Sequence, residues 1–169
     1  SAAHWFAVAL RLLGDDAAPG DRVEILLARA GALATCGHFA DAHAAMRESI
    51  ELVPKDAVGL RVRLTTACAG VEHLLGRHAD AYDRLIRALE SLEDADSAEA
   101  AALMIELAMD GVYRMEFEQI EPWARRALET ARPLGDRPLT GSAAAVLAWG
   151  AALCGRVSEA ETYRAEAAA

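Results

Sequence analysis

Histidine and cysteine side chains that could bind a metal gather around two glycine turns of the sequence. His38 and His43 lie five residues apart, and so do His73 and His78. This spacing places the two side chains of a pair on different helix faces or across a turn, which is a poor arrangement of metal ligands. Cys68 falls on a core-facing position, where a cysteine acts as a small apolar residue. We therefore expect no metal site.

The other residue types that catalysis needs do not form a known motif. The only lysine, Lys55, follows a proline, so the phosphate-binding loop G-x4-G-K-[ST] is absent. The sequence also lacks G-x-S-x-G and H-E-x-x-H. The acidic groups at residues 93–96 and 116–121 are typical of solvated segments. We predict a protein that is not an enzyme and that uses no cofactor.

The charge of the chain argues against one class of partner. Its 169 residues carry a formal net charge of −9, and no basic face is visible. Proteins that bind nucleic acids need such a face to displace counterions, so we expect no direct binding of DNA or RNA. No apolar run reaches the length of a membrane span, and no membrane partner is expected.

The cysteine count favours a reducing compartment. Cys36, Cys68 and Cys154 are odd in number and form no C-x-x-C motif, so a disulfide framework is not indicated. We expect a cytoplasmic protein, and no signal-peptide pattern opens the chain. The chain starts at Ser1 within a helical pattern and stops within another. We therefore expect a piece of a larger protein.

One short pattern recurs along the chain and indicates a repeat array. Residues 36–42 read C-G-H-F-A-D-A, residues 75–81 read L-G-R-H-A-D-A, and residues 154–160 read C-G-R-V-S-E-A. Each copy is a glycine turn followed by the start of a helix. The first two copies lie 39 residues apart and the last two 79, which leaves room for a degenerate copy with Met115 at the turn. Such a period is typical of helical repeat proteins.

Composition and apolar periodicity predict an all-α chain of about nine helices. Strong helix formers dominate and β-branched runs are rare. Asp21 and Ser97 have the type and place of N-caps, and Pro133, Gly135 and Pro138 act as breakers. Loops are predicted at residues 14–16 and 19–20. The predicted helices are 2–13, 21–35, 39–53, 56–75, 78–92, 97–113, 116–131, 139–153 and 158–168.

Small residues return at three positions of the repeat. Two antiparallel helices can approach closely only where side chains are short, so we expect these positions to lie between paired helices. Seven residues before each turn residue lie Ala30, Ala69, Ala108 and Ala148. Five residues after it lie Ala42, Ala81, Ile120 and Ala160. Twelve residues after it lie Ser49, Ala88, Ala127 and Ala167.

This register resembles the tetratricopeptide repeat, which has a large–small pattern, a glycine turn, a second Ala-x3-large helix and a closing proline. The first repeat follows it well, with Leu26, Ala30, Leu33, Gly37, Ala42, Met46, Ser49 and Pro54. The later repeats depart at Thr65, at Met115 and Ile120, and at Arg164. The resemblance implies a right-handed superhelical solenoid of antiparallel helix pairs. The implied solenoid is one domain over residues 1–169. It has a leading helix at 2–13 and repeats at about 21–54, 56–93, 97–133 and 137–169.

Long alanine- and arginine-rich repeats of this style also look like the helical sensor region of large bacterial LuxR-type transcriptional regulators. In that family an ATP-binding domain precedes the repeats and a helix-turn-helix follows them. The resemblance implies a non-catalytic sensor or scaffold module of a cytoplasmic regulator, which binds a protein or peptide partner or a small-molecule inducer. The alternative is a generic tetratricopeptide scaffold for a complex unrelated to transcription.

The resemblance also indicates where a partner would bind. In such solenoids the first helix of each pair lines a concave groove, and the residues six and two before each turn should point into it. Glycines there give room, and aromatic residues give a stacking surface that suits a peptide or a small apolar ligand. The candidate binding residues are Met109, Tyr113 and Trp149 at these positions, and Arg63, His73 and Ile105 further along the same face.

Other interpretations of these residues stay open. Met109, Tyr113 and Trp149 could instead pack against the next helix or against further repeats. Exposed solenoid ends, at Trp5 or at the last helix, would allow a homo-oligomer. The degenerate turn at Met115 is the first place to look for special local geometry.

Overall fold

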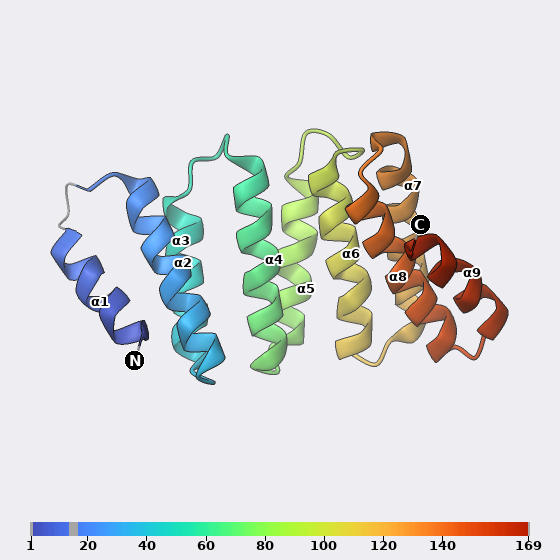
Figure 1. The fold of residues 1–169 in the computed structure, drawn as a ribbon, viewed down its shortest axis with the longest axis horizontal. Helices are drawn as coiled ribbons and strands as arrows, with labels where there is room; N and C mark the ends of the chain where they lie inside the picture. The colour runs from blue at the N-terminus through green and yellow to red at the C-terminus, as the bar shows by residue number, and fades with distance from the viewer. Residues whose placement is uncertain (1, 14–16, 169) are drawn as a thin grey trace. The chain divides into compact units, whose positions relative to one another are not determined.

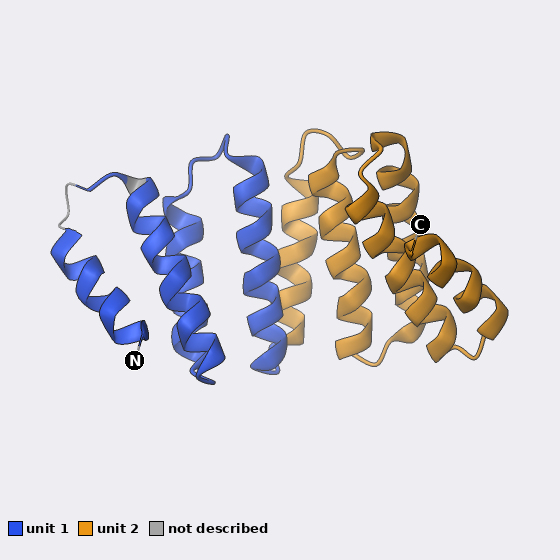
Figure 2. Cartoon of the chain, in the orientation of Figure 1, with its two compact units in different colours: residues 1–77 blue, residues 78–169 orange. Residues whose placement is uncertain are grey.

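The computed structural model describes residues 2–13 and 17–168, which form two compact units. Unit 1 comprises residues 1–77 and unit 2 comprises residues 78–169 (Figure 2). The described residues form nine α-helices and one short 3-10 helix, which confirms the all-α prediction. The loop predicted at residues 14–16 lies outside the described residues. The division into units does not test the prediction of one domain over residues 1–169.

Unit 1 is built from four helices, each of which packs against the next one along the chain (Figure 1). They are α1 (Ala2–Leu13), α2 (Pro19–Thr35), α3 (Phe39–Leu52) and α4 (Val58–Leu74). Leu26 and Ala30 of α2, Met46 of α3, and Cys68 and Val71 of α4 belong to its larger buried cluster. The three helices therefore share one core.

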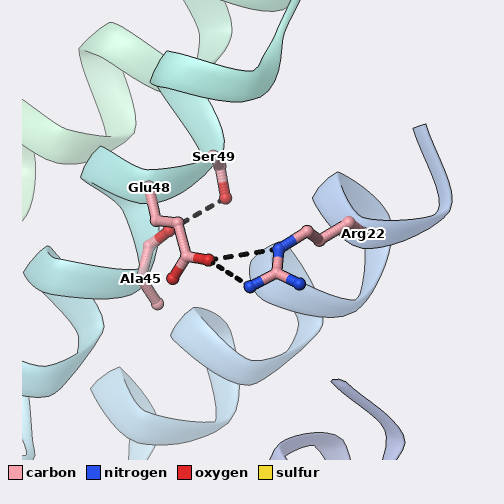
Figure 3. Close-up of polar contacts among 4 residues, drawn as sticks. All are labelled: Arg22, Ala45, Glu48 and Ser49. Atoms are coloured by element: carbon pink, nitrogen blue, oxygen red, sulfur yellow. Dashed lines mark hydrogen bonds and ion pairs between the residues drawn. The ribbon is translucent and has the colours of Figure 1, made fainter. Parts of the chain in front are cut away.

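An ion pair joins α2 to α3, and α3 buries one hydroxyl group (Figure 3). The Arg22 guanidinium donates two hydrogen bonds to Glu48 Oε1, of 3.2 Å from Nε and 2.8 Å from Nη2. Ser49 is fully buried at one of the predicted small positions, and its hydroxyl donates a hydrogen bond of 2.9 Å to the carbonyl of Ala45. The hydroxyl is thus satisfied within its own helix, so its burial leaves no polar atom without a partner.

Unit 2 contains the remaining helices. They are α5 (His78–Glu90), α6 (Ala98–Tyr113), the 3-10 helix η1 (Phe117–Gln119), α7 (Ile120–Leu134), α8 (Arg137–Leu153) and α9 (Val157–Ala167). Helices α6, α7 and α8 all contact one another, while α5 packs against α6 and α9 against α8 (Figure 1). Met104, Ile120, Leu128 and Leu147 are among the residues of its buried cluster. The core of unit 2 therefore lies between α6, α7 and α8.

The four predicted turns share one backbone geometry. Gly37, Gly76, Met115 and Gly155 have φ angles of 79°, 71°, 59° and 76°. In each turn, the N–H of the following residue donates to the carbonyl five residues earlier, over 2.9, 2.8, 2.8 and 2.8 Å. This is the Schellman ending of a helix, which needs a left-handed residue and therefore favours glycine. Among the described residues Met115 alone adopts a positive φ without being glycine, so the register correctly identified the degenerate turn.

Most of the predicted small positions are buried. One of them holds a large residue, and the structure gives the physical reason. Ile120 is large for its position, yet it is fully buried. A Cβ atom added to Gly150 would lie 2.7 Å from Ile120 Cγ2, and one added to Gly111 would lie 3.1 Å from Ile120 Cγ1. Glycines on α6 and α8 thus supply the space that a small residue on α7 would otherwise have left. The other fully or almost fully buried members are Ala30, Ala69, Ala108, Ala42, Ala81, Ser49 and Ala127.

The predicted and observed starts of α2 differ by two residues. This helix begins at Pro19 after an N-cap at Ala18, so residues 19–20 are helical and not a loop. Asp21 is therefore not the N-cap. It lies in the first turn, where a carboxylate still interacts favourably with the positive end of the helix dipole. The second predicted cap is confirmed, because the N–H of Ala100 donates to Ser97 Oγ over 3.2 Å.

The breakers near residue 135 act at slightly different places than predicted. Pro133 lies inside the last turn of α7, and the helix ends at Gly135, which has a φ of 68°. Pro138 lies in the first turn of α8, where a missing backbone N–H has no partner to lose. The side chain of Asp136 caps α8 by accepting a hydrogen bond of 2.9 Å from the N–H of Leu139. The segment predicted as one helix from residue 116 begins instead as η1.

Candidate functional site

The most exposed aromatic side chains of unit 2 lie on two neighbouring helices. Tyr113 on α6 is 44% exposed, and Trp149 and Leu153 on α8 are 46% and 41% exposed. Met109 precedes Tyr113 by one helical turn, as Trp149 precedes Leu153, so each pair lies along one side of its helix. Helices α6 and α8 are in contact. We call Met109, Tyr113, Trp149 and Leu153 the α6–α8 surface.

The Tyr113 ring is held by a neighbouring aromatic side chain. It stacks on the imidazole of His78, with ring centroids 6.3 Å apart and an angle of 19° between the ring planes. His78 is the first residue of α5. The contact restricts the orientation of Tyr113 while leaving much of the ring exposed, so the side chain is preorganised for stacking or apolar contact.

Charged groups surround the turn that follows Tyr113. Arg114 donates hydrogen bonds to Asp110 over 3.4 Å and to Glu116 over 2.7 Å, and its guanidinium lies 4.9 Å from the centre of the Tyr82 ring. Burial raises the pKa of the Asp110 carboxyl, and the nearby Arg114 opposes this change. Arg114 thus ties the end of α6 to α5 at the degenerate turn.

The six predicted binding residues fall into two sets. Ile105, Met109, Tyr113 and Trp149 lie in unit 2, and Arg63 and His73 lie on α4 of unit 1. Tyr113 and Trp149 are open to solvent, as the groove hypothesis requires, and so is Arg63.

The remaining predicted residues are more covered. Ile105 and Met109 are half-buried and pack against the core cluster of unit 2, as the packing alternative would have it. His73 is buried, so it offers little surface to a partner. Gly31 and Gly70 do leave room, because a Cβ atom added to either would meet no atom within 4 Å.

Unit 1 contains a second group of side chains that could carry chemistry. His43 on α3 and Cys68 and Glu72 on α4 are 8%, 0% and 1% exposed. His43 Nε2 and Glu72 Oε1 form a hydrogen bond of 2.8 Å. The imidazole nitrogen, the thiol sulfur and the carboxylate oxygen all lie within 4.8 Å of one another. We call these three residues the HCE cluster.

The HCE cluster was not predicted, because the spacing of histidines along the chain says nothing about their contacts with a cysteine and a glutamate on another helix. Cys68 and Glu72 are four residues apart on one helix face, and His43 comes from the preceding helix. The usable signal was a glutamate placed one turn after a core cysteine. A charged residue on the buried face of an amphipathic helix needs a partner, and the preceding helix α3 can supply one.

No helix in the described part of the chain combines the length and apolarity that a membrane span requires.

Comparison with known proteins identifies a similar fold. No protein-family model matches the chain, and no curated protein matches it. Among solved structures, the chain is similar to BtubC (BKLC) from P. vanneervenii, with a TM-score of 0.75 and 23% sequence identity. The similarity covers 98% of this chain and 69% of BtubC. At this level of identity the similarity concerns the fold alone.

Proposed function

We propose that this chain is a non-catalytic binding module that holds a protein or peptide partner on the α6–α8 surface. The observation that carries the proposal is the exposure of Tyr113, Trp149 and Leu153 on two contacting helices. Large exposed apolar side chains on contacting helices are candidates for an interaction site, because contiguous apolar patches mark such sites. Aromatic residues are also enriched among those that dominate binding energy.

The chemistry of the surroundings favours a particular kind of partner. Tyr113 and Trp149 each offer an apolar ring with a polar group at its edge, which suits a peptide with apolar anchors. The chain carries a net charge of −9, which attracts basic groups in the partner. The expected partner is therefore a peptide with apolar anchor residues flanked by lysine or arginine.

We further propose that the helix pairs form a tetratricopeptide-like right-handed solenoid within a cytoplasmic LuxR-type regulator. Support comes from the shared geometry of the turns at residues 37, 76, 115 and 155, spaced 39 or 40 residues apart. Partner binding would then change the packing of successive repeats and so the assembly of the regulator. A generic scaffold for another complex is the alternative. A Walker-type loop before the module and a helix-turn-helix after it would favour the regulator.

The test of the binding surface is a selection of peptides with a matched counter-selection. A displayed peptide library is selected on the chain and counter-selected on the Tyr113→Ala/Trp149→Ala variant. Selected peptides should bind the parent chain and lose affinity by about tenfold or more on the double variant, because two aromatic anchors are removed. Fluorescence anisotropy of the labelled peptides measures both affinities.

The control removes a more exposed pair of large apolar side chains elsewhere, one aromatic and one aliphatic. Trp5→Ala/Leu12→Ala does this on α1, where the two side chains are 70% and 81% exposed. This variant should bind the selected peptides as the parent does. Peptides that bind the Tyr113→Ala/Trp149→Ala variant equally well, or a selection that yields no binder, would refute the assignment of the α6–α8 surface.

A further inference from the structure

We propose that the HCE cluster is a metal site that binds Zn²⁺ between α3 and α4. The proposal rests on three different donor side chains, a nitrogen, a sulfur and an oxygen, whose ligand atoms lie within 4.8 Å of one another. All three residues are buried, so the cluster is not a chance gathering of surface groups. It lies in unit 1 and is independent of the function proposed for the α6–α8 surface in unit 2.

The donor set selects the class of metal. A thiolate is a soft ligand that favours Zn²⁺ over Mg²⁺ or Ca²⁺, and an imidazole nitrogen suits Zn²⁺ equally well. The Cys68 thiolate and the Glu72 carboxylate bring two negative charges, and a neutral His43 adds none. A divalent ion would therefore leave the buried site without net charge, which a site shielded from water requires.

The present distances are close to those of a bound ion. Tetrahedral zinc has bonds of about 2.1 Å to nitrogen and oxygen and about 2.3 Å to sulfur, which places ligand atoms roughly 3.4–3.6 Å apart. The His43–Glu72 hydrogen bond of 2.8 Å would have to lengthen, and any separation of ligand atoms near 4.8 Å would have to shorten.

Binding of Zn²⁺ would replace the His43–Glu72 hydrogen bond by bonds from the three side chains to the ion. The Cys68 thiol loses its proton to solvent and bonds to the ion as a thiolate. The hydrogen bond between His43 and Glu72 gives way to one bond from each side chain to the ion. Three protein ligands leave the fourth tetrahedral position for a water molecule. Because His43 lies on α3 and the other two ligands on α4, the ion would link these two helices.

The test is a metal titration of the full chain monitored by absorbance. Co²⁺ serves as the probe, because thiolate-bound Co²⁺ has a charge-transfer band and four-coordinate Co²⁺ has intense visible bands. Cys36 and Cys154 are exposed thiols, so both are first replaced by serine. We expect binding of one Co²⁺ per chain with a thiolate band, displacement of Co²⁺ by Zn²⁺, and a higher melting temperature with Zn²⁺.

Three variants of that background decide whether the HCE cluster is responsible. Cys68→Ala should abolish the thiolate band. Glu72→Gln and His43→Gln, which keep a hydrogen-bonding group at each place, should weaken Co²⁺ binding by about tenfold or more. Circular dichroism of each variant without metal confirms folding, and the two glutamine variants decide the matter if Cys68→Ala does not fold. Absence of the thiolate band in the background chain, or binding unchanged by Glu72→Gln and His43→Gln, would overturn the proposal.

Discussion

Met115 shows how a single residue can carry strain without changing the fold around it. Its φ of 59° matches the φ of the turn glycines, and its N–H donates to the Val112 carbonyl over 3.1 Å as theirs do to the corresponding carbonyls. An L-residue in this conformation is disfavoured because its Cβ approaches the following carbonyl oxygen. The hydrogen bonds of the turn and the packing of α6 against α7 keep it there.

Replacing Met115 by glycine should therefore stabilise the protein by about 0.5–1 kcal/mol. The Met115 side chain is 72% exposed, so little packing is lost. Urea unfolding followed by circular dichroism measures the change. The control is Gly155→Ala, which introduces a Cβ at a φ of 76° and should destabilise by a similar amount. An unchanged or lower free energy of unfolding for Met115→Gly would contradict this account of the turn.

Single residues also mark what the sequence could and could not predict about the sites. Tyr113 and Trp149 were chosen by their register relative to the turns, and both are exposed. His73 is predicted further along the same helix face and is buried, because a position on a helix face gives a direction from the helix axis and not the cover supplied by other elements. His43 and Glu72 meet through the packing of α3 on α4, which no spacing along the chain expresses.

At the scale of elements, one side chain determines how three helices of unit 2 approach each other. Ile120 begins α7 and is fully buried between glycines of α6 and α8. Its β-branched side chain is stiff at χ1, so it cannot move aside when a neighbour grows. The close packing of α6, α7 and α8 therefore depends on matched sizes at Gly111, Ile120 and Gly150.

A double-mutant cycle on Gly150 and Ile120 tests this dependence. Gly150→Ala should destabilise, since overpacking costs about 1–3 kcal/mol and the better helix propensity of alanine returns only about 1 kcal/mol. Ile120→Ala should cost about 2–5 kcal/mol by opening a cavity. The double variant should be more stable than the sum of the two effects, because the new methyl group enters the vacated space. Chemical denaturation measures all three free energies of unfolding.

The matched control for the cycle is Gly31→Ala on α2. An added Cβ there meets no atom within 4 Å, so the substitution should stabilise by up to about 1 kcal/mol through helix propensity alone. Additive effects of Gly150→Ala and Ile120→Ala would show that the two residues do not limit each other.

Helix positions were the most predictable elements because their ends depend on local chemistry. The first and last residues of α1 were predicted correctly, and the ends of most other helices fall within three residues of the prediction. The largest difference lies at the start of α7, where residues 117–119 form η1, and smaller ones occur at prolines. Pro133 and Pro138 are tolerated near helix ends, where the proline rule for helix interiors does not apply.

At the scale of the whole molecule, burial is unevenly distributed. Neither α1 nor α9 contains a buried residue among those described, whereas α4 and α6 contain eight each. Local opening is easiest where few apolar contacts must be broken. Stability should therefore be lowest in α1 and α9 and highest in α4 and α6.

Hydrogen–deuterium exchange read by mass spectrometry should show this order. Amides of α1 and α9 should exchange first, and those of α4 and α6 should be the most protected, with rates in α1 at least about tenfold faster. Exchange in strong denaturant supplies the reference rates for each peptide. Equal protection of α1 and α6 would mean that the chain opens only as a single cooperative body.

The order of helices was predictable from the repeat, but the stacking of successive pairs was not. A linear pattern gives the period and the small positions, whereas the angle between pairs depends on which side chains interlock at each contact. Ile120 illustrates this, since its partner Gly150 lies in the next repeat and is unremarkable in the sequence.

The Ile120–Gly150 contact also limits how such a chain can evolve by recombination. Repeat arrays readily gain, lose and exchange units because each unit contacts only its neighbours. The residues that correspond to Gly150 in the other repeats are Ala32, Val71 and Asp110. A crossover that joined the third repeat to any of these units would set a side chain against Ile120. The third and fourth repeats must therefore be inherited together, as one unit of exchange.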